Sequence, residues 1–175
     1  MKITEAMSEI KLFANKIESQ SDFIYRNLKR PENIKDPFDK DGSTQQAQVN
    51  AAIQSINDLE SNIVHYRSAI TKANMEQIVE LEGIKMSVAE WLIWRREVYP
   101  IRKHMLTTLA HGLASRNEEG RRGDFGRGEV NMQPVDYIVN VSDKWLLAEI
   151  QKLETIEQRL DGQLSMLNAT VDVTV

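Results

Sequence analysis

A seven-residue repeat of apolar side chains runs through two long stretches of the chain. In the first stretch, residues four and three positions apart are apolar with one exception: Ile3, Met7, Ile10, Ala14, Ile17, Ser21, Ile24 and Leu28. In the second stretch, two positions of each heptad are apolar: Val49, Ala52, Ile56, Leu59, Ile63, Tyr66, Ile70 and Ala73. A period of 3.5 residues places such side chains on one narrow stripe of a helix, which leaves water only against another helix. The sequence therefore predicts two long helices that pack through these stripes, either within one chain or between chains.

The segment between the two stretches carries turn signals. Pro31 and Pro37 lie in this linker and are typical of a chain reversal. The pair Ser43 and Gln46 then has the form of a capping box, in which the hydroxyl accepts from a backbone N–H and the amide side chain reaches back. We therefore expect an antiparallel helical hairpin, or coiled coil, over residues 3–74.

A different pattern begins after this hairpin. Residues 78–86 are typical of a short antiparallel β-hairpin with Gly83 in its turn. Ser87 and Glu90 have the form of a second capping box, which should open a third helix.

The third helix is apolar on two faces. The first face holds Trp91, Trp94, Val98, Ile101 and Met105, and the second holds Val88, Leu92, Tyr99, Leu106, Leu109 and Leu113. Two apolar faces predict two packing partners, so we expect this helix between other elements or at a subunit boundary. Pro100 lies inside the pattern and should kink the helix, or restart it, near Tyr99.

The last part of the chain combines a loop, a strand and a helix. Residues 115–133 form a flexible loop in our prediction, residues 135–141 alternate as a strand would, and residues 170–175 should add a last strand to the small sheet. Ser142 can cap a fourth helix that ends near Asn168. The apolar stripe of this helix, interrupted by Glu157, is Leu146, Ile150, Leu153, Leu160, Leu164 and Leu167.

Together these elements predict a mainly α (α+β) fold, with a long antiparallel helical hairpin or coiled coil, two further helices and a small antiparallel β element. We expect one elongated domain over residues 1–175. Its parts would be a helical hairpin at 3–74, a β-hairpin and third helix at 75–114, a flexible Gly/Arg loop at 115–133, and a strand, fourth helix and tail at 134–175.

Composition and spacing exclude several kinds of site. The chain has no cysteine, which excludes disulfides, thiolate catalysis and thiolate metal sites. His104 and His111 lie two helical turns apart, too far to share a metal ion, and His65 belongs to another helix. No serine nucleophile elbow occurs, and paired carboxylates such as Glu118 and Glu119 lie in polar segments with nothing to raise their pKa. We therefore expect a protein that is not an enzyme, with no catalytic residue, metal or cofactor.

Charge and hydropathy bear on the partners. A net charge of −4 gives no bulk attraction to nucleic acid or to anionic lipid, so neither is an expected partner. No segment reaches the roughly 20 apolar residues that span a bilayer. The first residues lead directly into an amphipathic helix rather than a secretory signal. We expect a cytoplasmic protein, or one assembled into a virion, that is not secreted through a signal peptide.

Two sets of residues are candidate binding surfaces. Apolar and aromatic side chains of the third and fourth helices resemble an obligate oligomer interface: Trp91, Trp94, Tyr99, Leu146, Ile150, Leu153, Leu160 and Leu164. The second set is a candidate ligand loop over residues 116–128, with Arg116, Arg121, Arg122 and Arg127. Four acidic residues balance these arginines and weaken their attraction for a polyanion: Glu118, Glu119, Asp124 and Glu129.

Helix ends and turns follow one another in a characteristic order. In sequence they are Ile3-Thr-Glu-Ala-Met7, Asn27, Pro31-Glu32, Asp36-Pro37, Ile70-Thr-Lys-Ala-Asn74, Gly83, Ser87, Leu92, Arg95, Val141 and Leu167-Asn168. This order resembles the septicolysin-like family of small helical proteins, which has no established activity. The chain departs from the family at Ala169-Thr170, where a tryptophan is usual. The resemblance implies an α+β fold with a long helical hairpin that assembles into rings or other symmetric homo-oligomers.

The leading hypothesis from the sequence is a non-enzymatic, homo-oligomeric structural or assembly protein, such as a component of a phage particle. Its partners would be further copies of itself and other structural proteins of a larger assembly. One alternative is a nucleic-acid-associated protein that binds through the arginine loop at 116–128. Another is a membrane-active protein, as the name of the septicolysin-like family implies.

Overall fold

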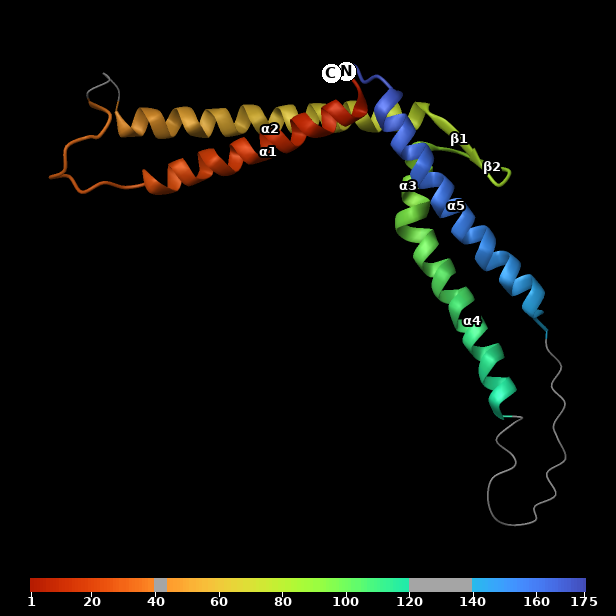
Figure 1. Cartoon of the computed structure of the whole chain (residues 1–175). Coiled ribbons are helices and arrows are strands. Elements are labelled where there is room, and N and C mark those ends of the chain that lie inside the picture. The colour runs from red at the N-terminus through yellow and green to blue at the C-terminus, as the bar shows by residue number, and fades with distance from the viewer. Residues whose placement is uncertain (40–43, 120–139) are drawn as a thin grey trace, which may run out of the picture. The chain divides into compact units, whose positions relative to one another are not determined.

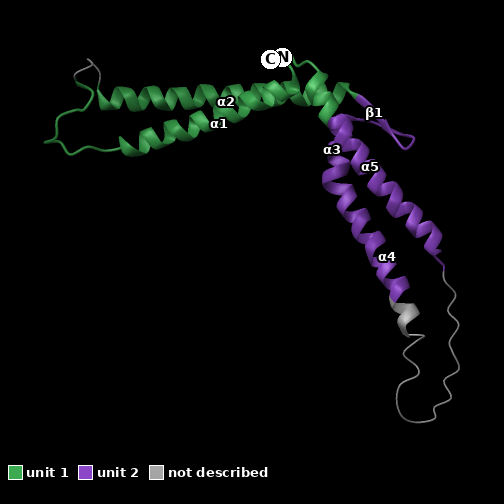
Figure 2. Ribbon diagram, viewed as in Figure 1, with its two compact units in different colours: residues 1–77, 165–175 green, residues 78–164 purple. Residues whose placement is uncertain are grey.

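The computed structural model describes residues 1–39, 44–119 and 140–175. Helices make up 77% of these residues, beside a small antiparallel sheet of two strands, so the predicted mainly α (α+β) class is confirmed. The chain divides into two compact units (Figure 2). Unit 1 comprises residues 1–77 and 165–175, and unit 2 comprises residues 78–164. This division was not foreseen from the sequence, which suggested a single elongated domain.

Unit 1 is built on the predicted helical hairpin. Helices α1 (Ile3–Arg26) and α2 (Gln45–Glu76) run side by side in opposite directions (Figure 1). The hydroxyl oxygen of Thr44 accepts a hydrogen bond from the backbone N–H of Ala47 at 3.1 Å and so caps α2. The expected capping residue, Ser43, lies outside the described residues, and the observed cap stands one residue later.

The stripe of α1 that faces α2 differs from the predicted one at every second position. Ala6 is fully buried, whereas its neighbour Met7 is 46% exposed. One heptad later, the ring of Phe13 packs edge-on against Tyr66 with centroids 5.4 Å apart. The predicted positions that are exposed instead are Met7, Ala14, Ser21 and Leu28. A stripe through Met7 and a stripe through Ala6 both fit a heptad. The structure uses the stripe through Ala6, whose small side chain allows close approach and which includes the aromatic contact of Phe13.

The C-terminal tail pairs with the first residues of the chain. Lys2 and Asp172 form an isolated antiparallel bridge, and Lys2 Nζ donates to Asp172 Oδ2 at 2.8 Å. Val173 is buried in the core cluster that Ile3 and Ile70 also join. The prediction that the tail adds a strand to the β-hairpin is therefore wrong, because its valines complete the core of the helical hairpin instead.

Unit 2 begins with the predicted β-hairpin. Strand β1 (Ile78–Leu81) pairs antiparallel with strand β2 (Ile84–Ser87). The turn between them has positive φ at both Glu82 and Gly83. Two successive positive φ angles are typical of the two-residue turns that match the twist of paired strands.

A helical stretch follows the β-hairpin and has three parts. Helix α3 (Val88–Ile93) leads into a π-helical segment, Trp94–Val98, which leads into α4 (Tyr99–Glu119). The predicted capping box is present: Ser87 Oγ accepts from the backbone N–H of Glu90 at 3.2 Å, and the Ser87 backbone N–H donates to the Glu90 carboxylate at 2.7 Å. The Ser87 hydroxyl also donates to the Glu90 carboxylate at 2.7 Å. This bond, followed by the one from the Ser87 backbone, holds the pKa of Glu90 below its usual value.

Helix α5 (Asp143–Thr170) begins where the sequence predicted and lies beside α4 (Figure 1). The hydroxyl oxygen of Ser142 accepts from the backbone N–H of Trp145 at 3.2 Å. The buried side chains that join α4 and α5 are Tyr99, Leu106, Leu146 and Leu153.

Glu157 interrupts the apolar stripe of α5 because it faces the hydroxyl group of Tyr99 in this core. The buried Tyr99 hydroxyl accepts from Lys103 Nζ at 3.3 Å. Hydrogen bonding to the Glu157 carboxylate raises the pKa of Tyr99, and burial acts in the same direction. The bond to Tyr99 in turn raises the pKa of Lys103. A polar cluster thus occupies one layer of an otherwise apolar contact.

Some sequence predictions lie at the limits of what the structure describes. Residues 115–119, predicted as loop, are the last turn of α4, and the rest of the loop to residue 133 lies outside the described residues. The predicted strand at 135–141 also lies outside them, except for a bend at residues 140 and 141. None of the helices in the described ranges has an apolar stretch long enough to cross a bilayer.

Candidate interaction surface on helix α4

The helical backbone changes register at the π-helical segment Trp94–Val98. The backbone N–H of Tyr99 bonds to the carbonyl oxygen of Trp94, five residues back instead of the four of an α-helix. Pro100 follows directly and has no N–H to give to the carbonyl four residues before it. The predicted distortion near Tyr99 is present, and it amounts to one extra residue in the helix.

The extra residue moves the buried stripe by one position. Trp91, ahead of the π-helical segment, is fully buried, and Trp94, the first residue of the segment, is partly buried. An uninterrupted α-helix would continue this face through Val98 and Ile101, but the observed core continues through Tyr99. The inner stripe, which contacts β1 and α5, is therefore Trp91, Trp94, Tyr99, Leu106, Leu109 and Leu113.

The displaced residues, together with Ile93 before the π-helical segment, form an exposed apolar row, which we call the outer stripe. It consists of Ile93, Val98, Ile101 and Met105, exposed by 49%, 44%, 72% and 46% respectively. The last three occupy a and d positions of a heptad, and Ile93 lies one π-helical turn before Val98. Full burial of a side chain of this size contributes roughly 1.5–3 kcal/mol. Such a row on the surface is typical of a contact site.

Charged residues of opposite sign flank the outer stripe. Glu97 occupies the g position of its heptad and Arg102 occupies the e position. Arg102 forms an ion pair with Glu149 of α5. Glu97 pairs with Arg96 at 2.7 Å, but both side chains are more than half exposed, so this neighbouring pair contributes little.

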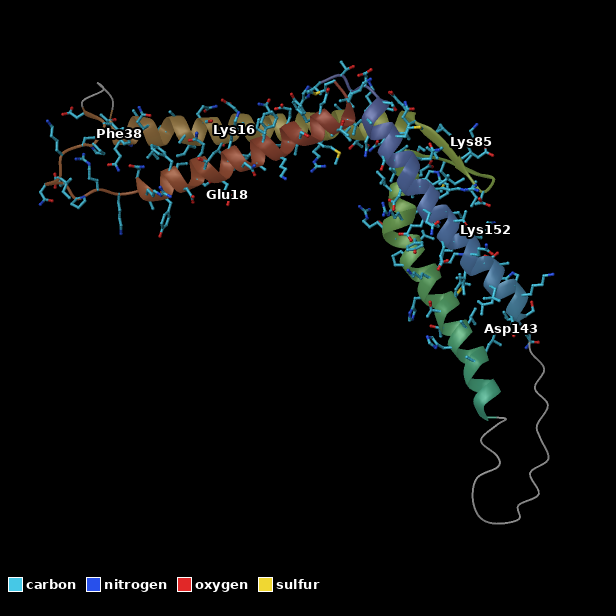
Figure 3. The ribbon with its side chains drawn as sticks, in the orientation of Figure 1. Lys16, Glu18, Phe38, Lys85, Asp143 and Lys152 are labelled. Carbon is cyan, nitrogen blue, oxygen red and sulfur yellow. The ribbon has the colours of Figure 1, made fainter. Side chains whose placement is uncertain are left out.

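A small hollow of about 60 Å³ lies beside Arg102 in unit 2. Its lining combines apolar residues with two cations and one carboxylate: Ile84, Trp94, Leu153, Ile156, Arg102, Lys152 and Glu149. Figure 3 labels Lys152 on α5. A hollow of this size holds a few water molecules and is too small for a cofactor. Its excess positive charge suits a carboxylate.

The eight residues that the sequence suggested as an oligomer interface are largely engaged within unit 2. Those buried are Trp91, Tyr99, Leu146, Leu153 and Leu160, and those partly buried are Trp94, Ile150 and Leu164. Most of them pack against one another across α4 and α5. Self-association stays a prediction, and the outer stripe, which runs from α3 through the π-helical segment into α4, offers exposed apolar groups for it.

The other candidate site cannot be assembled from the described residues. Arg116 lies in the last turn of α4, and Arg121, Arg122 and Arg127 lie outside the described ranges. Within those ranges, no three His, Asp or Glu side chains come together as metal ligands would.

Known proteins provide no neighbour for this chain: no family model, no curated protein and no solved structure matches it. The resemblance to the septicolysin-like family therefore stays a prediction.

Proposed function

We propose that the protein is a non-enzymatic structural or assembly protein that associates with itself. The observation that supports this most is the outer stripe, with Ile101 at its centre and 72% exposed. The helix that carries it already contacts α5 through its inner stripe. A row of four large apolar side chains in water forgoes several kcal/mol of burial, which association recovers.

The helical hairpin of unit 1 also supports association. In residues 11–39 and 44–69, Ala52 is the one buried side chain. Of the isoleucines of α2 in this part, Ile56 and Ile63 are partly buried and Ile53 is exposed. Most of the stability of a protein helix comes from packing of its apolar face. Two long helices that cover each other incompletely are therefore suited to complete a bundle with further copies.

The role that fits these features is the presentation of stiff helices within a larger particle. A phage particle is one setting for such a role. Binding of nucleic acid through the arginine loop, and activity on membranes, stay predictions from the sequence.

Light scattering during size-exclusion chromatography, over a range of concentrations, tests the proposal. We expect the wild type to exceed the 20.1 kDa of one chain as concentration rises. Ile101→Lys should remain monomeric, because it places a charge in the middle of the apolar contact. Leu147→Lys is the matched control, since Leu147 is 66% exposed on α5 of the same unit; it should associate as the wild type does. A wild type that stays at the mass of one chain at every concentration refutes the proposal.

A further inference from the structure

We infer that the outer stripe binds the outer stripe of a second copy of this chain, with the two α4 helices parallel and in register. The inference rests on the proposed function and adds the partner and its orientation. Val98, Ile101 and Met105 alternate three and four residues apart, which is the spacing of a two-stranded seam. In a parallel pair, each of these side chains meets its own counterpart across a two-fold axis.

The flanking charges select the parallel orientation. In a parallel pair, a g residue of one helix faces the e residue five positions later on the other. Glu97 is the g residue and Arg102 follows it by five, so the pair forms two Glu97–Arg102 contacts of opposite charge. In an antiparallel pair, g faces g and e faces e. In such a pair centred on Ile101, Arg102 opposes Arg102 with an offset of roughly 3 Å along the axis, which like-charge repulsion disfavours, and Glu97 does not meet Arg102 of the second copy.

The surroundings of Arg102 favour an incoming carboxylate. The hollow beside it holds Arg102 and Lys152 against the single carboxylate of Glu149. A guanidinium group has five N–H donors, so Arg102 can bind Glu149 of its own chain and Glu97 of the second copy together. Glu97 gives up little, because its contact with Arg96 is exposed to solvent.

A charge exchange tests the orientation. In a parallel pair, Glu97→Lys places a lysine opposite Arg102 of the second copy. The double variant Arg102→Glu with Glu149→Arg places a glutamate opposite Glu97, while it keeps the ion pair to α5 in reversed form. Each variant alone should therefore dimerise roughly tenfold more weakly than the wild type, because two attractions become two repulsions. An equimolar mixture of the two variants should recover wild-type affinity, because both contacts again join opposite charges.

The antiparallel pair predicts a different order of affinities, measured by sedimentation equilibrium. In that arrangement the wild-type protein already opposes like charges at Arg102. Each variant would therefore match the affinity of the wild type, and the mixture would bind more tightly than the wild type. That result overturns the inference but leaves the proposed function intact. A wild type that self-associates with no response to either variant or to Ile101→Lys also overturns it. Monomers throughout refute the proposed function itself.

Cysteine cross-linking tests the register, because the chain has no cysteine of its own. Val98→Cys and Met105→Cys, each used alone, should form disulfide-linked dimers under mild oxidation, since identical positions meet in a parallel pair. In an antiparallel pair centred on Ile101, position 98 meets position 105 roughly 10 Å from its own counterpart. A dimer that forms when the two variants are mixed, but with neither alone, would overturn the inference. Leu147→Cys serves as the control for random collisions.

Discussion

The indole N–H of Trp91 donates a hydrogen bond to the backbone carbonyl oxygen of Val79 at 3.0 Å in the interior of unit 2. Trp91 has no exposed surface, and its ring meets Trp94 edge-on with centroids 5.4 Å apart. The bond therefore fixes α3 against β1. It sets which face of the helical stretch enters the core before the register changes at the π-helical segment.

Trp91→Phe should lower the free energy of unfolding by about 2–3 kcal/mol, because it leaves the Val79 carbonyl without this donor and opens a space in the core. Urea unfolding followed by circular dichroism measures the loss. Trp145→Phe is the control, since Trp145 is 46% exposed, and it should change stability by less than about 0.5 kcal/mol. Equal losses in the two variants would show that the bond to Val79 contributes nothing specific.

The contact between Tyr99 and Glu157 predicts energetic coupling between α4 and α5. Tyr99→Phe should cost about 1 kcal/mol in the wild type, because Glu157 and Lys103 both lose their partner. In a Glu157→Leu background the same substitution should cost less, because the layer is already more apolar. A double-mutant cycle from urea unfolding gives the coupling, which we expect to be on the order of 1 kcal/mol. A coupling near zero would mean that Glu157 breaks the apolar stripe for some other reason.

Local signals predicted several features closely. Gly83 identified the turn of the β-hairpin, and Ser87 with Glu90 identified the start of α3, because each depends on a few adjacent residues. The heptads likewise identified the helical hairpin. In α1, however, Ala6 and Met7 are both apolar, so two stripes fit the pattern, and only contacts such as Phe13 on Tyr66 decide between them.

The candidate surface itself could not be predicted from periodicity. A helical pattern assumes one constant rotation per residue, and the π-helical segment breaks this assumption. The sequence therefore placed Val98, Ile101 and Met105 on one face with Trp91, whereas the structure separates them. Pro100 was the available signal, because a residue without an N–H allows the preceding turn to change its hydrogen bonds. It marked where the register changes, but not in which direction.

The tip of the helical hairpin predicts a response to acid. Asp36 Oδ2 accepts from the backbone N–H of Gln45 at 2.9 Å, and Oδ1 accepts from Phe38 at 3.0 Å. The bond from Gln45, followed by that from Phe38 and the nearby Arg30, holds the pKa of Asp36 below its ordinary value of 3.8. The unfolded chain binds the proton more readily, so the contribution of Asp36 is complete well above pH 3.8 and is lost as the pH falls through the lowered pKa.

Asp36→Asn tests this dependence, because the amide oxygen can still accept from the backbone but carries no charge. Thermal unfolding from about pH 7 to about pH 2 should show the wild type above the variant at neutral pH, and the two curves should converge below pH 3.8. The substitution Asp39→Asn is the control, since Asp39 is an exposed carboxylate three residues from Asp36. Parallel curves at all pH values would show that the Asp36 charge does not stabilise the tip.

The change of register at the π-helical segment predicts which deletions the chain tolerates. Removal of Arg96, whose side chain is 74% exposed, combined with Pro100→Ala, leaves a continuous α-helix. In that helix the residues of the inner stripe, from Trp91 to Leu113, fall at spacings of three, four and seven, which keep them on one face, so the core contacts with α5 are kept. We expect cooperative unfolding within about 1 kcal/mol of the wild type.

Removal of the exposed His104 from the regular part of α4 instead rotates Leu106 and all later residues by about 100°. That variant should lose several kcal/mol, because buried leucines turn toward water. Equal damage from the two deletions, measured by urea unfolding, would contradict the view that the π-helical segment is a one-residue insertion that the fold accommodates.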